Sequence, residues 1–237
     1  MIQVDALIIG AGPIGGYLAK KLCQAGHTVL MIEEHNQIGR PFQCAGLVNP
    51  GSMEKVGLES TALTRIWGAR IHGPGGTLVE IGSPERTRTW SVCRKLFDEA
   101  VVAQAISAGG SLMLNSTPKG TSISDEYVVT TISTDNTELT VKSKVVLGCD
   151  GAHSWVRRYH RMGRVRETMI GFQIDVTGYL HREGKLDMYT GQQIAPGFFA
   201  WAIPTGTTTR IGTFSRPDLL GGKSSEETLA ELLNHKL

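Results

Sequence analysis

Three glycines and one acid early in the chain have the spacing of an anion-binding turn followed by a ribose-binding carboxylate. Residues 4–33 read VDALIIGAGPIGGYLAKKLCQAGHTVLMIE and contain Gly10-x-Gly12-x-x-Gly15, with Glu33 at the end. Gly10 permits a tight turn, Gly12 lets the backbone approach a pyrophosphate, and Gly15 allows a helix to pack closely. A phosphate would then bind the backbone N–H groups and the positive dipole end of that helix.

The elements around this turn must present it to a ligand. Residues 5–9 and 28–32 are short apolar runs typical of buried parallel strands. Between them Pro13 suits a first helical turn and Gly26 suits a helix end. The apolar positions at helical spacing are Ile14, Leu18, Leu22 and Ala25. Such a βαβ order predicts a dinucleotide site, and the acid after the second strand favours FAD or NAD over a 2′-phosphorylated cofactor. The alternative is an ordinary glycine-rich turn.

Composition restricts the other classes of function. The chain has 237 residues, 41% of them hydrophobic, which is enough for one large core or two modest ones. A net charge of +2 gives no sign of nucleic-acid binding. Basic residues cluster at Arg157, Arg158, His160, Arg161, Arg164 and Arg166. This cluster is interpreted as a solvated connection, with contact to phospholipid head groups as the alternative.

The cysteines and the start of the chain bear on the compartment. Cys23, Cys44, Cys93 and Cys149 lack paired metal-ligand spacing, so no metal site is predicted. The first strand begins almost at Met1, which leaves no room for a leader. We therefore expect free thiols and a cytoplasmic protein, in contact with a membrane only peripherally if at all.

The middle of the chain departs from simple alternation of strands and helices. Residues 37–52 have the composition of a structured loop, and residues 67–92 have β-like runs, which predicts a small inserted sheet over about 62–93. Residues 95–108 are expected to form a helix with Leu96, Ala100, Ala103 and Ile106 on its apolar face, ended by Gly109-Gly110. Strands are expected at 112–114, 127–133, 138–141 and 145–148, with a turn at Asp135-Asn136.

The last segment predicts one more helix, over residues 225–237. Ser224 and Glu227 have the spacing of a capping box. Leu229, Leu232 and Leu233 form an apolar stripe that needs a partner. The expected fold is α/β: a Rossmann-like nucleotide-binding domain over residues 1–160, which carries the inserted β-sheet, and a partial α+β substrate domain over 161–237.

A second motif leads to a resemblance. Residues 145–158 read VVLGCDGAHSWVRR and place Asp150-Gly151 after a buried strand. This segment resembles the D-G-x-x-S-x-V-R signature of the FAD-dependent hydroxylase and reductase superfamily, in which the aspartate lies near the FAD. That superfamily also has an arginine that opens the helix after the inserted sheet, matched here by Arg94. The resemblance implies FAD as the tightly bound cofactor, whereas Asp150 alone could be a turn or a helix cap.

Two further segments resemble the geranylgeranyl reductase family, including the archaeal digeranylgeranylglycerophospholipid reductases. Residues 40–50, RPFQCAGLVNP, are similar to the family's cysteine-bearing loop, and residues 196–204, PGFFAWAIP, are similar to its Y-x-W-x-F-P substrate motif. Phe199 stands for the tyrosine and Ile203 for the phenylalanine, so the pocket stays apolar but loses a phenolic hydroxyl. The downstream G-x-G is half kept, as Gly212-Thr213-Phe214.

The resemblance assigns roles to residues. It places FAD on Gly10, Gly12, Pro13, Gly15, Glu33, Arg40, Cys44, Ala45, Gly46, Arg94, Asp150 and Gly151. It places a prenyl chain on Phe198, Phe199, Trp201, Ile203 and Pro204, which would otherwise be core of a β-rich domain. Cys44 is the expected proton donor or alkene-positioning group, with a small buried hydrophobe as the alternative. Trp201 is expected to stabilise positive character through its π face.

The implied activity is reduction of C=C bonds in prenyl chains of membrane lipids or quinones, with electrons from NAD(P)H or a ferredoxin. One alternative is an aromatic-ring monooxygenase that uses NAD(P)H and oxygen. Another is a catalytically silent FAD-binding fragment, because the family's third FAD motif, a Gly-Asp segment, does not follow Pro204. The resemblance therefore covers nearly all of this chain but only the first part of the family fold, as expected of a chain shortened at its C-terminal end.

Overall fold

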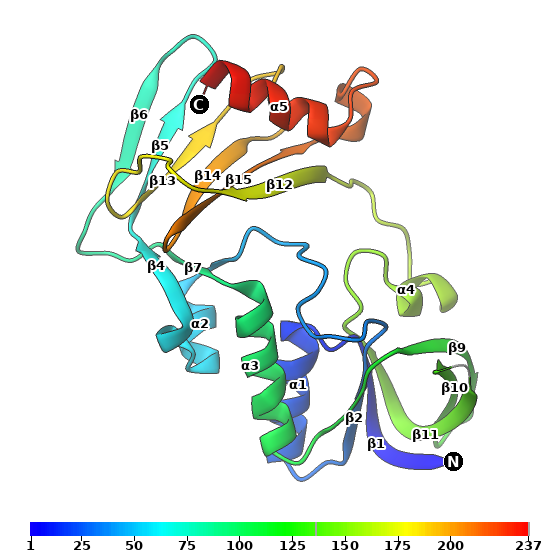
Figure 1. Ribbon diagram of the computed structural model, residues 1–237. Coiled ribbons are helices and arrows are strands. Elements are labelled where there is room, and N and C mark those ends of the chain that lie inside the picture. Colours follow the sequence, from blue (N-terminus) through cyan, green and yellow to red (C-terminus); the bar gives the residue numbers. More distant parts are fainter. Residues whose placement is uncertain (136, 237) are drawn as a thin grey trace. The chain divides into compact units, whose positions relative to one another are not determined.

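The computed structural model describes residues 1–135 and 137–236, which form two compact units (Figure 1). The first unit contains Met1–Gln43 and Arg94–Arg164, and the second contains Cys44–Cys93 and the chain from Val165 onward. Each unit is built from segments that are far apart in the sequence. The expected division at residue 160 stays a proposal about domains.

The first unit contains a six-stranded sheet in the order β8-β2-β1-β11-β10-β9. The strands are β1 Ile2–Ile9, β2 Val29–Ile32, β8 Ser111–Met113, β9 Ser116–Ile123, β10 Val128–Thr134 and β11 Thr137–Gly148. Pairing is parallel from β8 to β11 and antiparallel on both sides of β10. The carboxyl ends of β1, β2 and β11 therefore meet at one edge of the sheet, which is the ligand edge of an open α/β fold.

Helix α1, Pro13–Gln24, follows β1 as predicted, and Gly26 (φ 86°) ends it. Its buried residues are Gly15, Gly16 and Ala19. Of the predicted apolar positions, Leu18 and Leu22 pack partly buried on the core, whereas Ile14 is 70% exposed and Ala25 is exposed, so the predicted face was right only in its middle. The glycines are buried by close contact with a second helix. A Cβ added to Gly16 would lie 3.1 Å from side-chain carbons of Val101 and Val102.

That second helix is α3, Arg94–Ser107, which lies beside α1 in Figure 1. It buries Phe97, Val101, Val102 and Ala105, while Leu96 and Ile106 are half exposed. The predicted face through Leu96 and Ile106 was therefore wrong. Helix α3 carries apolar side chains on two faces. The face with Val101 and Val102 is the buried one, because it packs on α1.

The strands after α3 also differ from the prediction. The runs expected at 138–141 and 145–148 form one continuous strand, β11, because the whole of it pairs with β10 or β1. Strand β9 was not predicted, since its sequence STPKGTSI has few apolar residues. Thr134 pairs with Thr137 across the expected hairpin turn, in which Asp135 has φ 43° and Asn136 lies outside the described residues.

The remaining helix of the first unit is α4, Trp155–Tyr159. The Ser154 hydroxyl accepts a hydrogen bond from the Arg157 backbone N–H at 3.0 Å and caps the helix start. The arginine-rich turn that follows α4 is exposed at Arg161, Met162 and Arg164.

The second unit contains a six-stranded sheet in the order β12-β15-β14-β13-β5-β6 and a three-stranded sheet in the order β3-β7-β4. The first comprises β5 Gly68–His72, β6 Leu78–Gly82, β12 Ile170–Val176, β13 Lys185–Tyr189, β14 Ala200–Thr205 and β15 Thr208–Ser215. The second comprises β3 Leu47–Val48, β4 Ala62–Ile66 and β7 Thr89–Val92. Short helices are α2 Pro50–Val56 and the 3-10 turns η1 Glu59–Thr61 and η2 Pro217–Leu219.

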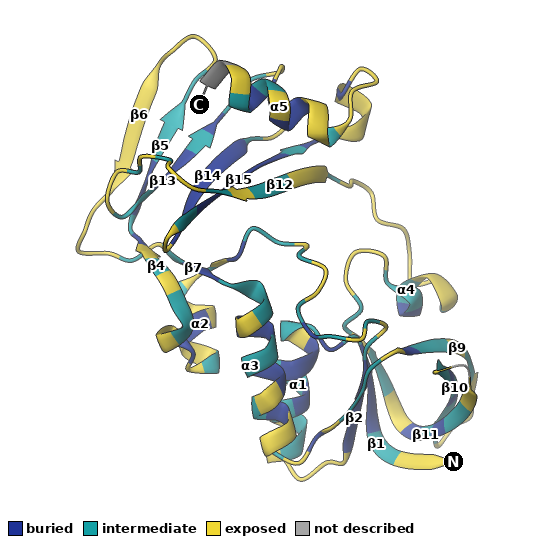
Figure 2. Ribbon diagram, viewed as in Figure 1, coloured by how far each residue is buried: buried dark blue, intermediate teal, exposed yellow. Residues whose placement is uncertain are grey.

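The predicted insert at 62–93 is therefore only partly a sheet of its own. Strands β4 and β7 stay in the small sheet, but β5 pairs in parallel with β13, more than 100 residues later, and carries β6 with it. The strands of the larger sheet differ in exposure. Every residue of β14 is buried and every residue of edge strand β6 is exposed (Figure 2).

Helix α5, Ser225–Lys236, covers β12 and β15 of the larger sheet. The predicted capping box is present: the Ser224 N–H donates to the Glu227 carboxylate at 2.7 Å, and the Glu227 N–H donates to the Ser224 hydroxyl at 3.1 Å. Leu229 and Leu232 are buried against this sheet, with Leu233 partly buried beside them. Leu237, the predicted last residue, lies outside the described residues.

Candidate functional site

The glycine turn lies at the carboxyl edge of the first unit's sheet. The Gly10 N–H donates to the carbonyl of Ile32 at 2.8 Å, which joins the turn to the end of β2. A Cβ on Gly15 would lie 2.0 Å from the Gly10 carbonyl oxygen, so only glycine allows this approach of helix and turn. A Cβ on Gly12 would meet no atom within 4 Å. The start of α1 is thus open to an anion at Gly12 and Pro13.

Glu33 is drawn onto this turn by hydrogen bonds. One carboxylate oxygen accepts from the Ala11 N–H at 3.0 Å, and the other lies 2.6 Å from Nδ1 of His35. The Glu33 side chain is 14% exposed, so it is mostly buried beside the turn. His35 was not selected from the sequence, and an imidazole two residues after the ribose acid is the signal that could have found it.

The second motif lies against the first. The Cys149 N–H donates to the carbonyl of Ile9 at 2.7 Å, and a Cβ on Gly10 would lie 2.9 Å from the Cα of Asp150. One carboxylate oxygen of Asp150 accepts from the Val156 N–H at 3.1 Å, so this residue also supports the start of α4. Burial, with the Asp150 carboxylate beside it, raises the pKa of the Cys149 thiol. The structure thus brings Gly10 and Asp150 together, as the parallel pairing of β1 with β11 requires.

Arg94 opens α3 in the same unit. Its Nε and Nη2 donate to the two carboxylate oxygens of Asp98, both at 2.8 Å. Burial raises the pKa of Asp98, and the nearby Arg94 guanidinium only partly offsets it. The loop with Arg40 passes the start of this helix, since a Cβ on Gly39 would lie 2.6 Å from the Cα of Lys95. Arg40 itself is exposed, with its guanidinium 4.0 Å from the Phe42 ring centroid.

In the second unit, the cysteine loop (residues 44–46) meets the apolar motif that lies some 150 positions further along the chain. Ala45 packs on a cluster formed by Ile66, Ala69, Leu186, Met188, Phe199, Trp201, Ile203 and Phe214. The Gly46 carbonyl accepts from the Val92 N–H at 2.8 Å, which continues the pairing of β3 with β7. Two segments selected separately from the sequence are therefore neighbours in one unit. Cys44 is partly buried.

The predicted substrate residues differ in exposure. Trp201 and Ile203 are 4% and 1% exposed, and Phe214 meets the indole edge to face at 5.1 Å. Phe198 is 46% exposed and stacks on Phe199 at 4.4 Å. The Pro204 carbonyl accepts from the Ser91 hydroxyl at 2.6 Å. Phe198 and Phe199 are thus the members of the motif most accessible to a ligand, and Trp201 and Ile203 lie behind them.

Sequence reasoning missed the side chains that hold the cysteine loop. Arg210 on β15 donates to the Ala45 carbonyl at 3.0 Å, and Gln173 on β12 donates to the Cys44 carbonyl at 3.2 Å. Arg210 is 5% exposed and pairs with Asp175. A charged residue inside the buried strand TTRIGTFS is the signal that could have indicated a specific partner.

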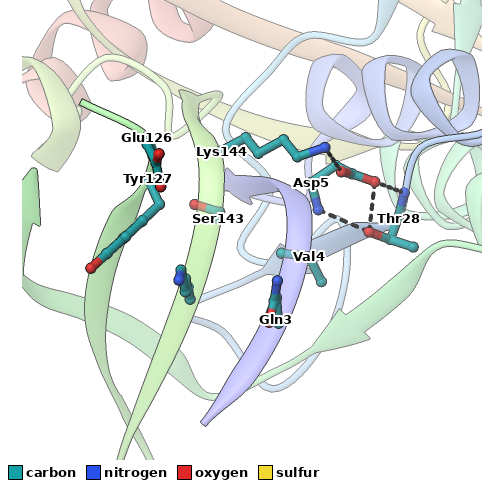
Figure 3. Close-up of a pocket in the computed structure, with 9 residues that line it drawn as sticks. Gln3, Val4, Asp5, Thr28, Glu126, Tyr127, Ser143 and Lys144 are labelled. Carbon is teal, nitrogen blue, oxygen red and sulfur yellow. Dashed lines mark hydrogen bonds and ion pairs between the residues drawn. The ribbon is translucent and has the colours of Figure 1, made fainter. Parts of the chain in front are cut away.

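Two other groups of polar side chains lie in the first unit. Ligand atoms of Glu33, Glu34 and His35 lie within 4.8 Å of one another, but Glu33 already bonds the glycine turn. A hollow of about 270 Å³ lies at the opposite, amino end of β1 (Figure 3). Lys144 and Thr28 there both bond the Asp5 carboxylate, whose pKa they hold well below its usual range. This hollow is remote from the glycine turn.

Together these contacts define the class of the first unit. It has a parallel sheet, a glycine turn at its carboxyl edge, an uncapped helix start for a pyrophosphate and a carboxylate at the end of β2 for a ribose. That combination is an adenine-dinucleotide site. The residues present also fit FAD in particular, because the Asp150-Gly151 segment lies against the glycine turn. The predicted contacts Cys44, Ala45 and Gly46 belong to the second unit.

Residues 3–210 match the model of the FAD binding domain family, and the chain belongs to that family. The predicted cofactor, FAD, and the predicted Rossmann-like fold are confirmed. The chain is 32% identical over 213 residues to the digeranylgeranylglycerophospholipid reductase of Methanosarcina acetivorans, covering 85% of this chain and 52% of that protein. It is 29% identical over 244 residues to a reductase of the same name, number 3, of Methanosphaera stadtmanae, covering 98% and 60%.

A solved structure has the same fold: a geranylgeranyl bacteriochlorophyll reductase-like protein of Thermoplasma acidophilum, with TM-score 0.88 and 24% identity over all of this chain and 63% of that one. The resemblance to the geranylgeranyl reductase family is confirmed by these matches. The chain spans between half and two thirds of the length of the relatives it matches.

Proposed function

We propose that this protein is an FAD-dependent reductase of C=C bonds in prenyl chains of lipids or quinones. The observation that carries the proposal is the contact of the cysteine loop with the apolar motif of β14. An isoprenoid tail has no polar group to recognise, so burial and shape must hold it. A thiol-bearing loop packed on apolar side chains could bring a proton donor to an alkene held among them. The reductase names of the relatives support the same chemistry.

The proposed function assigns FAD binding and prenyl-chain binding to different sets of residues. Gly10, Gly12, Pro13, Gly15, Glu33, Arg40, Arg94, Asp150 and Gly151 of the first unit would hold FAD. The family resemblance assigns FAD contacts to Cys44, Ala45 and Gly46 as well. Bound and reduced, FAD supplies the hydride that an isolated alkene needs. Phe198 and Phe199 would contact the chain and exclude water, while Trp201, Ile203 and Pro204 back them.

Cys44 would hold the proton that the second alkene carbon receives. An isolated trisubstituted alkene accepts hydride poorly, so a proton must arrive with it or positive character must be stabilised. The Trp201 indole would supply that stabilisation. Electrons would come from NAD(P)H or a ferredoxin.

The proposal includes peripheral contact with a membrane surface, where prenyl lipids reside. Exposed arginines after α4, among them Arg161 and Arg164, offer positive charge to phospholipid head groups. In the part of the chain that the structure describes, we find no helix long and apolar enough to cross a membrane.

The test compares two cysteine variants. The FAD-loaded protein is reduced with dithionite without oxygen and mixed with a geranylgeranyl phospholipid, and saturation is followed by mass spectrometry. Cys44→Ser is expected to lower turnover about 100-fold, the typical contribution of a positioned acid. Cys23→Ser in α1, also partly buried, is the matched control and should leave turnover unchanged.

Three outcomes contradict this function. Equal turnover in the two variants would remove Cys44 from the mechanism. Substrate-dependent oxygen consumption with an aromatic substrate and no prenyl reduction would favour the monooxygenase. Bound flavin that reduces nothing would favour a catalytically silent FAD-binding chain.

A further inference from the structure

Arg210 is a buried cation that joins two strands of the larger sheet to the cysteine loop. Its Nε and Nη2 donate to the two carboxylate oxygens of Asp175 on β12, at 2.9 and 3.1 Å. Its Nη1 donates to the Ala45 carbonyl at 3.0 Å. The side chain is 6% exposed, whereas that of Asp175 is 45% exposed. The guanidinium therefore sits beneath the loop, and its carboxylate partner lies on the solvent side.

The loop rests directly on this guanidinium. A Cβ added to Gly46 would lie 2.9 Å from Nη1 of Arg210 and 2.6 Å from the Val92 carbonyl oxygen, so no side chain fits there. Gln173, which neighbours Asp175 on the same face of β12, adds a bond from its Nε2 to the Cys44 carbonyl at 3.2 Å. Two side chains of the sheet thus hold two successive carbonyls of the loop.

The chemistry of arginine suits this task. A buried charge is tolerated only when it is paired and hydrogen-bonded, so Arg210 is fixed by Asp175 before it meets the loop. Hydrogen bonds from a charged donor are roughly twice as strong as neutral ones. The planar fork directs its donors in fixed directions, whereas a lysine ammonium is a point charge on a flexible stem.

We propose that Arg210, held by Asp175, is a positioning residue that fixes the cysteine loop on the β15 face beside Trp201 and so sets the place of the Cys44 thiol. The consequence for thiol reactivity stands on the geometry alone. The consequence for turnover rests on the proposed function, in which Cys44 supplies a proton.

The same sheet provides a matched control. Arg70 on β5 is also a mostly buried arginine paired with a strand carboxylate, since its Nε donates to Asp187 at 2.7 Å. Asp187 is in register with Ala202, which packs under α5, whereas Trp201 faces the cysteine loop. Because alternate residues of a strand point to opposite faces, Arg70 lies on the face away from the loop.

The experiment compares Arg210→Lys with Arg70→Lys in the FAD-loaded protein. Urea unfolding establishes that each variant is folded. Alkylation of Cys44 by iodoacetamide is then followed by peptide mass spectrometry from pH 6 to pH 10. Arg210→Lys is expected to change the Cys44 alkylation rate about tenfold, because the loop loses a charge-assisted hydrogen bond, and to shift its pH profile. Arg70→Lys is expected to alkylate as the parent does.

Equal Cys44 alkylation profiles in Arg210→Lys, Arg70→Lys and the parent would overturn the proposal. If Arg210→Lys does not fold, Asp175→Glu takes its place, since it keeps a carboxylate for the buried guanidinium but changes the distance at which that guanidinium is held. An unaltered Cys44 profile in Asp175→Glu would then be the contrary result.

Turnover separates this proposal from the proposed function. If the parent reduces prenyl lipid, Arg210→Lys is expected to lower kcat about tenfold with KM unchanged, as for a group needed only in the chemical step. If the alkylation profile of Arg210→Lys is shifted and the parent reduces no prenyl lipid, the positioning role is supported and the reductase function is contradicted. If the profile of Arg210→Lys is unshifted and the parent reduces prenyl lipid, the positioning role is contradicted and the reductase function is supported.

Discussion

At the scale of single residues, Asp98 orients Arg94, the arginine to which the resemblance assigns an FAD contact. The carboxylate is 4% exposed and accepts both donors of a bidentate pair. Burial raises its pKa, so the ionised form is disfavoured in the folded chain. A carboxyl whose pKa is raised on folding favours the folded state when protonated, and that contribution is lost as the pH rises above the unfolded value. At neutral pH this shift adds no stability, while the two hydrogen bonds orient Arg94.

Replacing Asp98 by Asn should separate these effects. Asparagine keeps the size but cannot accept two donors from Arg94, so FAD affinity should fall about tenfold, the loss of one charge-assisted bond. The free energy of unfolding of the FAD-free variant at pH 7 should be equal to or higher than that of the parent. FAD titration by flavin fluorescence and urea unfolding measure the two quantities.

The control for this prediction is Asp218→Asn. Asp218 also binds an arginine with both oxygens, since Arg216 donates to it at 3.1 and 2.7 Å, but it is exposed and lies in the second unit. Equal FAD affinity in the two variants would show that Asp98 does not orient a cofactor-binding arginine.

At the scale of elements, the parallel pairing of β5 with β13 aligns Asp187 with Arg70 and Tyr189 with His72. Asp187 is fully buried and accepts from Arg70, His72 and Tyr179 at 2.7, 2.6 and 3.0 Å. Burial by itself would raise the pKa of Asp187. The hydrogen bonds from the three donors lower this pKa by more than burial raises it, so the net shift is downward. Burial likewise raises the pKa of Tyr179, which stays protonated.

This network predicts a pH-dependent stability. A carboxyl whose pKa is lowered on folding stabilises the fold above its unfolded value and loses that contribution as the pH falls through the folded value. The unfolding free energy should therefore fall below about pH 4. Asp187→Asn should cost about 3 kcal/mol at pH 7, as expected when one partner of a buried pair is removed.

Urea unfolding at pH 7, 4 and 3 measures this effect. The variant should lose less stability than the parent between pH 4 and pH 3, because it has no carboxylate to protonate there. Identical slopes in the two proteins would contradict the assignment. Asp218→Asn again serves as the exposed carboxylate control.

At the scale of the whole molecule, the chain spans between half and two thirds of the length of its relatives and carries the glycine turn, Glu33 and the Asp150-Gly151 segment, but not the third FAD motif expected after Pro204. The glycine turn, Glu33 and Asp150 are joined by bonds within the first unit. We therefore expect the purified chain to retain FAD through desalting, as seen in its visible spectrum.

Gly15→Val should abolish this retention, because its Cβ would overlap the Gly10 carbonyl oxygen and move α1 off the turn. Gly75→Val is the matched control, since a Cβ there meets no atom within 4 Å. Loss of flavin from the parent as well would show that this chain alone does not complete the site.

How much the sequence predicts depends on how local the determining contacts are. The β1-turn-α1 unit, the end of α1 at Gly26 and the capping box of α5 were all predicted, because each is encoded by backbone preferences of a few successive residues. The buried face of α3 was predicted wrongly and that of α1 only in part, since both helices carry apolar residues on two sides and their mutual packing decides which side is buried. Strand β9 was missed because its polar sequence lacks a strand pattern.

The sequence by itself determined the class of this protein. A phosphate-binding turn needs glycines at fixed spacing, because each one is required by the backbone at its own position in the turn. A residue distant in the sequence cannot take that place. Only the tertiary structure decided that β5 pairs with β13, that Asp150 lies on Gly10, and that Arg210 holds the cysteine loop. These contacts join segments up to 165 positions apart. Many faces and charges of the chain are compatible with one another, and the packing of the whole unit decides which of them meet.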